Sequence, residues 1–143
     1  MRPSGWIDEP EYSHIKKIMP LPVVDLLVVY KGKILLMKRN NPPLKNSWYT
    51  PGSRVLLGES LEDAVKRTLM EETGLTLNRI VQKGTMSQIF NELQSITTFY
   101  FVEVTNDAVV MNDEHSEFKW ISEINDETHP YLKEMIETSN IFD

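Results

Sequence analysis

The chain of 143 residues has no cysteine. This absence excludes disulfide bonds, thiolate catalysis and zinc sites with cysteine ligands, and it is typical of a reducing compartment. No stretch approaches the roughly 18 consecutive apolar residues of a membrane-spanning helix, and the N-terminal residues lack the apolar run of a signal peptide. We therefore expect a cytoplasmic protein with no membrane partner.

Positive charge is also scarce. Fifteen lysines and arginines stand against 21 aspartates and glutamates, which gives a formal net charge of −6. A chain of this charge has no broad positive field to attract nucleic acid, so we expect no nucleic-acid partner. An anionic substrate would need local cations or a bound metal ion. The length predicts one domain over residues 1–143.

The apolar pattern predicts an α/β domain with a mixed sheet and flanking helices. A continuous apolar run is typical of a buried strand, and the segment between Ser60 and Gly74 has the capping residue, the helical spacing and the stop of a helix. The expected strands span 23–30, 33–38, 48–50, 80–89, 96–104 and 117–121, and the other expected helices span 11–18 and 130–138. Residues 1–20 form a polar N-terminal extension.

The helix before Gly74 carries an acidic pair, Glu71 and Glu72, near its C-terminal end. Magnesium and manganese prefer oxygen ligands, and neighbouring helical residues differ by about 100° in direction, so the two glutamates should serve different roles. Glu59, before the helix, is placed to pair with Arg67. Taken alone, the pattern fits equally a solvated helix face held by ion pairs.

The spacing of these residues resembles the Nudix box, G-x5-E-x7-R-E-U-x-E-E-x-G-U, where U is a bulky aliphatic residue. Two positions depart from it, because Ser53 stands for the first glycine and Thr68 for the glutamate after the arginine. The resemblance implies the Nudix fold, an α/β/α sandwich with a mixed sheet, and hydrolysis of a nucleoside diphosphate derivative with Mg²⁺ or Mn²⁺. The matching positions are Glu59, Arg67, Leu69, Glu71, Glu72, Gly74 and Leu75.

Thr68 points to a narrower resemblance, because a threonine hydroxyl is no general base at neutral pH. The chain is similar to the GDP-mannose mannosyl hydrolase branch of the superfamily, which also lacks that glutamate and attacks the sugar carbon. The pieces that match are PLPVVDLLVV (20–29), Lys38-Arg39 with Trp48 nine residues later, PGSRV (51–55), the box and DEHSEFKW (113–120).

That branch implies a role for each matching residue. His115 is the expected base, with Arg39 and Arg67 as further catalytic residues. The expected metal ligands are the Gly52 carbonyl, Glu72 and Glu114. Glu71, a carboxylate that the branch tends to lose, is a further expected ligand and leaves the metal cluster of an ordinary Nudix enzyme open. The expected substrate contacts of the branch are Asp25, Arg39 and Arg54. Tyr100 is a further candidate, for stacking on a base, with core packing as the alternative. A homodimer is also implied, and Trp6 and Tyr12 offer a contact.

Three functions therefore stand against one another. The first is hydrolysis of a GDP-mannose-like nucleotide sugar to sugar and nucleoside diphosphate, with His115 as base. The second is an ordinary Nudix pyrophosphatase that cleaves ADP-ribose, a nucleoside triphosphate or a related compound at phosphorus, with Glu71 or Glu114 handling the water. The third is a catalytically silent nucleotide-binding module, because loss of a box glutamate is also how enzymes decay.

Overall fold

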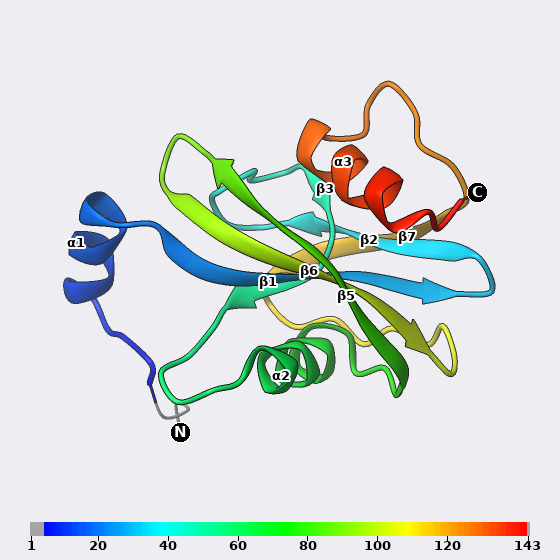
Figure 1. Ribbon diagram of the computed structural model, residues 1–143, viewed down its shortest axis with the longest axis horizontal. Helices are drawn as coiled ribbons and strands as arrows, with labels where there is room; N and C mark the ends of the chain where they lie inside the picture. Colours follow the sequence, from blue (N-terminus) through cyan, green and yellow to red (C-terminus); the bar gives the residue numbers. More distant parts are fainter. Residues whose placement is uncertain (1–4, 143) are drawn as a thin grey trace.

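The computed structural model describes residues 5–142 and shows a twisted mixed sheet between helices (Figure 1). Nine parallel pairs join two strands distant in sequence, β1 and β6, while every other strand pairing is antiparallel. The main strand order is β3-β2-β1-β6-β5, with β4 on β1 and β7 on β2. The strands are β1 (Leu21–Tyr30), β2 (Lys33–Arg39), β3 (Trp48–Tyr49), β4 (Gly52–Arg54), β5 (Leu77–Ile89), β6 (Gln94–Val104) and β7 (His115–Ile121).

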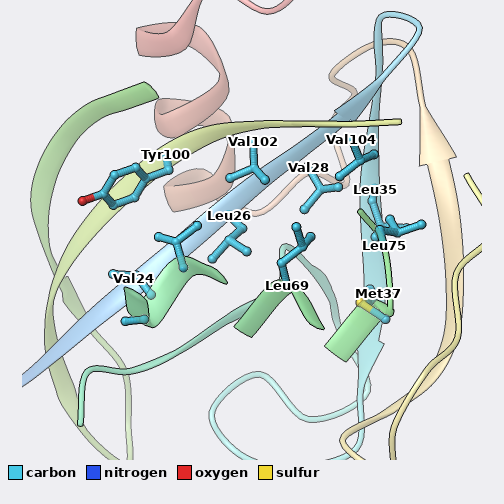
Figure 2. Close-up of a cluster of buried hydrophobic side chains, with 12 residues drawn as sticks. Val24, Leu26, Val28, Leu35, Met37, Leu69, Leu75, Tyr100, Val102 and Val104 are labelled. Carbon is cyan, nitrogen blue, oxygen red and sulfur yellow. The ribbon is translucent and has the colours of Figure 1, made fainter. Parts of the chain in front are cut away.

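The helices α2 (Leu61–Thr73) and α3 (Pro130–Ser139) cover opposite faces of the sheet (Figure 1). Alternate residues of β1 serve the two layers: Leu26 packs on the α2 side and Leu27 on the α3 side. Figure 2 shows the α2-side cluster, in which Leu69 meets side chains of three strands. The predicted α/β sandwich with a mixed sheet is confirmed.

Helix α2 begins and ends at the residues that the sequence predicts. Ser60 Oγ accepts the Asp63 backbone N–H at 3.1 Å, and Gly74 ends the helix in the left-handed region at φ 66°. The helical spacing predicts an inner stripe of Leu61, Ala64, Val65, Thr68 and Leu69. The last four are buried, but the prediction is wrong for Leu61, which is 38% exposed in the first turn. Further along, Glu72 is buried instead, so the helix directs a carboxylate inward where its periodicity favours an apolar residue.

A third helix, α1 (Glu11–Ile18), has the predicted bounds but contributes nothing to either core layer. It has no buried residue, and Figure 1 shows it beside one end of the sheet, away from α2 and α3. Ile18, at the end of the helix, is 64% exposed. The short strand β4 is the one element that the pattern missed. Among residues 5–142, no helix is both long and apolar enough to cross a membrane.

Candidate active site

One cavity of about 540 Å³ lies where the N-terminal segment, β1, β4 and the C-terminal half of α2 meet. Carboxylates and guanidinium groups share its lining: Glu71, Glu72 and Glu114 face it together with Arg39 and Arg54. An anionic ligand held near carboxylates requires positive charge between them, from arginines or from a cation. The cavity thus brings together most of the residues predicted for the site.

The helix α2 presents its two adjacent glutamates in different ways. Glu72 is 2% exposed, whereas the Glu71 side chain is 52% exposed and accepts an N–H from Arg67 at 3.4 Å. The 100° step between neighbouring helical residues produces this difference. The two carboxylates thus lie in different environments, and the expectation that they serve different roles stays a prediction.

Arg67 and Glu59 form a two-point clamp at the start of α2. Arg67 Nε donates to Glu59 Oε2 at 2.6 Å and Nη2 donates to Oε1 at 2.9 Å, with both side chains less than one-fifth exposed. Nη2 also donates to the Arg54 carbonyl at 3.0 Å, and Glu59 Oε1 accepts the Leu56 N–H at 2.9 Å. The hydrogen bond from Arg67 holds the pKa of Glu59 below its ordinary value. Arg67 therefore fixes the loop between β4 and α2, and reaches the cavity at its edge.

Buried Glu72 has an unpaired oxygen. Its Oε1 finds no hydrogen-bond partner among the described residues, and the nearest basic group is His115 Nε2 at 3.6 Å. Burial raises the pKa of Glu72 well above its ordinary value, and Glu114 raises it further. The Gly52 backbone acts in the opposite direction through a hydrogen bond. A cation beside this carboxylate would offset the shift, because opposite charge favours the ionised form.

The donor chemistry suits a hard divalent cation. Carboxylate oxygens from Glu71, Glu72 and Glu114 and the backbone of Gly52 offer oxygen ligands alone, which is what Mg²⁺ and Mn²⁺ prefer. Among residues 5–142, no three acidic or imidazole side chains are gathered at ligating distance of one point. The unpaired Glu72 oxygen nevertheless shows a buried acceptor without a donor, so these residues fit such an ion in kind.

His115 lies behind the carboxylates. Its side chain is 1% exposed, and it is not part of the cavity lining. Burial, with Arg39 nearby, lowers the pKa of His115 to about 4, so the ring is neutral at pH 7. Its Nδ1 has no hydrogen-bond partner among the described residues. The structure thus places a neutral His115 ring, which carries one N–H, against Glu72, and gives it no direct path to a molecule in the cavity.

The two arginines predicted for the substrate both reach the cavity. Arg39 Nε donates to the Pro43 carbonyl at 2.6 Å, which ties the guanidinium to the loop after β2. Arg54 lies over the Tyr12 ring at 5.8 Å and donates to the Gly5 carbonyl at 3.4 Å. Both guanidinium groups therefore have protein partners that hold them in the cavity lining, where they suit a diphosphate.

Tyr100 occupies a different place from the one predicted. It is 5% exposed within the α2-side core, and its hydroxyl donates to Gln82 at 3.4 Å (Figure 2). The alternation of side chains along β6 directs this ring to the α2 layer, away from the cavity. Its position supports a packing role and no contact with substrate.

The N-terminal segment makes one wall of the cavity, which sequence reasoning missed. Trp6, Tyr12 and Lys16 all line it, and Lys16 Nζ lies 4.9 Å from the centre of the Tyr12 ring. The segment is held at Gly5, whose φ of 83° and close approach to Leu57 leave no room for a Cβ atom. No sequence signal linked residues 5–18 to the box. The dimer contact predicted for Trp6 and Tyr12 stays a prediction.

The floor of the cavity carries three buried polar side chains. Asp25, Tyr49 and Gln88 are each no more than 5% exposed, yet all three line the cavity. Burial raises the pKa of Asp25 to about 7 and that of Tyr49 above its ordinary value, while the Gln88 amide lowers both. Of these three residues, only Asp25 was predicted as a substrate contact. For Gln88 the one available indication is a glutamine within a predicted strand, and nothing in the sequence indicates Tyr49.

The two departures from the box contact each other. Ser53 and Thr68 share a hydrogen bond between their hydroxyl groups, and Thr68, fully buried, donates its own proton to the Ala64 carbonyl at 2.7 Å. With that proton committed, Ser53 is the donor of the shared bond. The pair ties β4 to α2 in the place where the box has a glycine and a glutamate.

Comparisons with known proteins identify the family of this chain. The chain is 28% identical to the low-salt glycan biosynthesis protein Agl8 of Haloferax volcanii, over 95% of this chain and 92% of that protein. It is 46% identical over 56 residues to an ADP-ribose pyrophosphatase of Methanocaldococcus jannaschii, over 39% of this chain and 33% of the relative.

Among solved structures, the NUDIX domain of NrtR from Shewanella oneidensis, complexed with ADP ribose, is 25% identical. It superposes with a TM-score of 0.68 over 94% of this chain and 97% of that one. The model of the NUDIX domain matches residues 19–134. The chain belongs to the NUDIX domain family, and it is a Nudix hydrolase that acts on nucleoside diphosphate derivatives.

Proposed function

We propose that this enzyme hydrolyses the pyrophosphate bond of a nucleoside diphosphate derivative by attack of water at phosphorus, with Mg²⁺ or Mn²⁺ as cofactor. The observation that carries the proposal is the place of His115. A base for attack at a sugar carbon must reach water beside the sugar, and this imidazole is 1% exposed behind Glu72. Glu71 and Glu114, by contrast, line the cavity.

The roles of the chain's own groups follow from their positions. Glu72, Glu114, Glu71 and the Gly52 carbonyl hold the metal ion, which when bound supplies positive charge to the diphosphate. Arg39 and Arg54 orient and neutralise the diphosphate from the lining of the cavity. Arg67 keeps the loop before α2 in place through Glu59. Glu71 or Glu114 accepts the proton of the attacking water.

The relatives support the same reading. One is an ADP-ribose pyrophosphatase, and one solved structure has ADP ribose bound. ADP-ribose and nucleotide sugars share a nucleoside diphosphate joined to a second group, so one cavity suits either class.

A second function keeps support from two observations. Thr68 is fully buried with its proton on Ala64, so it offers neither base nor ligand, and neutral His115 stands 3.6 Å from Glu72. Release of sugar from a GDP-mannose-like compound by attack at carbon uses such a histidine as base. The relative named for glycan biosynthesis is compatible with this chemistry.

Hydrolysis in water enriched in heavy oxygen separates the two functions. The enzyme is incubated with Mg²⁺ and ADP-ribose, GDP-mannose or a nucleoside triphosphate, and products are resolved by chromatography and mass spectrometry. Attack at phosphorus yields a labelled phosphate product, as in AMP with ribose 5-phosphate. Labelled free sugar with unlabelled nucleoside diphosphate contradicts the proposal.

Two variants sharpen the result. His115→Gln should lower turnover by no more than about tenfold and leave the products unchanged, because the residue supports Glu72 from behind. Loss of the order of 10²- to 10⁴-fold is the size expected for removal of a general base. Glu72→Gln is the matched substitution on the same contact, and it should abolish the Mg²⁺-dependent turnover. Absence of turnover with every compound would instead favour a silent binding module.

A further inference from the structure

The floor of the cavity has hydrogen-bonding capacity that the protein itself does not use. Asp25 Oδ2 and the Tyr49 hydroxyl are both buried, and neither has a hydrogen-bond partner among the described residues. Native structures leave few buried polar atoms unpaired, because each loses its bonds to water. Here one acceptor and one donor lie in the same cavity lining.

Gln88 connects the two unpaired groups and has a fixed orientation. Thr97 Oγ1 donates to Gln88 Oε1 at 3.2 Å, and Ser95 lies 2.8 Å from the Thr97 hydroxyl. The Gln88 Nε2 group also donates to Met135 Sδ at 3.9 Å, so the amide keeps one N–H and one oxygen lone pair for other partners. The Gln88 side chain is close enough to lower the pKa of both Asp25 and Tyr49, although no hydrogen bond of standard geometry joins it to Asp25 Oδ2 or to the Tyr49 hydroxyl. The three side chains therefore form one polar surface.

The chemistry of this surface selects its ligand. A hydroxyl group donates one hydrogen bond and accepts others, so neighbouring hydroxyls satisfy a carboxylate and a phenol together. A phosphate group does not, because Asp25 would repel it. Aromatic side chains that suit a flat ring also line the cavity, at Trp6 and Tyr12 in the N-terminal wall and at Phe90 beyond Gln88. The floor therefore suits the polyhydroxylated part of a substrate.

We propose that Asp25, Tyr49 and Gln88 form a subsite that binds the hydroxyl groups of a sugar attached to the nucleoside diphosphate. The inference rests on the proposed function for the presence of the diphosphate, and it adds that the second group is a sugar. Tyr49 and Gln88 are then specificity-determining residues that separate nucleotide sugars from nucleoside triphosphates.

Tyr49→Phe tests the subsite, because it removes only the unpaired hydroxyl. In the free protein that hydroxyl has no partner, so the melting temperature should stay unchanged or rise. Calorimetric titration without divalent metal gives the affinities for ADP-ribose and for ADP. We expect the variant to bind ADP-ribose about tenfold more weakly, the size of one hydrogen bond, and to bind ADP as the wild type does.

Two comparisons make the test decisive. Tyr30→Phe is the matched control, since Tyr30 lies at the far end of β1 against Trp120 and outside the cavity lining; it should change neither affinity. Asp25→Asn should also weaken ADP-ribose binding selectively. Equal weakening of ADP and ADP-ribose by Tyr49→Phe would place the floor on the nucleoside half and overturn the proposal, as would no weakening of either.

The readout also separates this inference from the proposed function. Binding is measured without turnover, so a selective loss of ADP-ribose affinity supports the subsite even if labelling shows attack at carbon. Conversely, hydrolysis at phosphorus with an unaltered ADP-ribose affinity in Tyr49→Phe supports the proposed function and contradicts the subsite.

Discussion

Replacement of Glu59 by glutamine isolates the clamp that holds the loop before α2. The carboxylate accepts from Arg67 Nε at 2.6 Å and Nη2 at 2.9 Å, and its Oε1 also accepts the Leu56 N–H. A glutamine amide must put its NH2 group at one of these two positions, where it faces a donor. In either flip, at least one charge-assisted hydrogen bond is lost.

The magnitude follows from burial. A hydrogen bond to a charged group contributes about 1.5–3 kcal/mol, and the Arg67 and Glu59 side chains are only 19% and 17% exposed. We expect Glu59→Gln to lower the free energy of unfolding by about 2 kcal/mol. For a domain of this size, that is a fall in Tm of about 4–8 °C.

Glu62→Gln is the matched control on the same helix. Glu62 pairs with Lys66 at 3.7 Å, four residues apart, and both side chains are more than half exposed. Such a pair contributes about 0.3–0.5 kcal/mol. Urea unfolding of both variants and the wild type measures the contrast. If Glu59→Gln costs no more than Glu62→Gln, the clamp does not stabilise the fold and the reasoning is wrong.

Acid provides a further check on the same residue. The pKa of Glu59 is lower in the folded protein than in the unfolded chain, because of Arg67. Its contribution is therefore fully present above the unfolded pKa, about 4.3, and is lost as the pH falls through the folded value. The difference between wild type and Glu59→Gln should shrink over that window.

Three other changes have defined outcomes. His129 Nδ1 caps α3 by accepting the Tyr131 N–H at 3.1 Å, and burial lowers the pKa of His129. The free energy of unfolding should therefore fall as the pH drops below about 6.5. His129→Asn keeps a capping side chain, and its unfolding midpoints should show a weaker dependence on pH. Thr68→Glu buries an unpaired charge and should cost about 3 kcal/mol in urea unfolding, with partial recovery when Ser53→Gly is added. Gly52→Ala places a Cβ atom 2.2 Å from Asp25 Oδ1, so kcat/KM should fall at least about tenfold.

Much of the fold and part of the site could be predicted because their signals are local. Helix α2 is predicted by its capping residue Ser60, by Gly74 at its end and by the spacing of its apolar residues. The position of the acidic pair near its C-terminal end is predicted from the same segment. Glu71 and Glu72 differ in burial as helical geometry requires. Strand β4 was not predicted, because its three residues, Gly52–Arg54, are too few to show an alternation of apolar and polar side chains.

The remainder depends on contacts between elements distant in the chain. The cavity floor unites β1, β3 and β5 through Asp25, Tyr49 and Gln88, and no spacing links these positions. Tyr100 was expected at the substrate, but the side of β6 that it faces is set by pairing with β1. The burial of His115 likewise follows from its register opposite Arg39 on β2.

The contact between Ser53 and Thr68 also affects how the family motif is counted. A motif scored position by position sees two separate defects in this chain, at the first glycine and at the glutamate after the arginine. In three dimensions the two positions are in contact, so the hydrogen-bonded hydroxyl groups of Ser53 and Thr68 together replace the glycine and the glutamate of the motif. A variant that restores only the glycine or only the glutamate should therefore be less stable than the wild type or the variant that restores both. Relatives that carry both substitutions should be described by a separate motif, in which these two positions vary together.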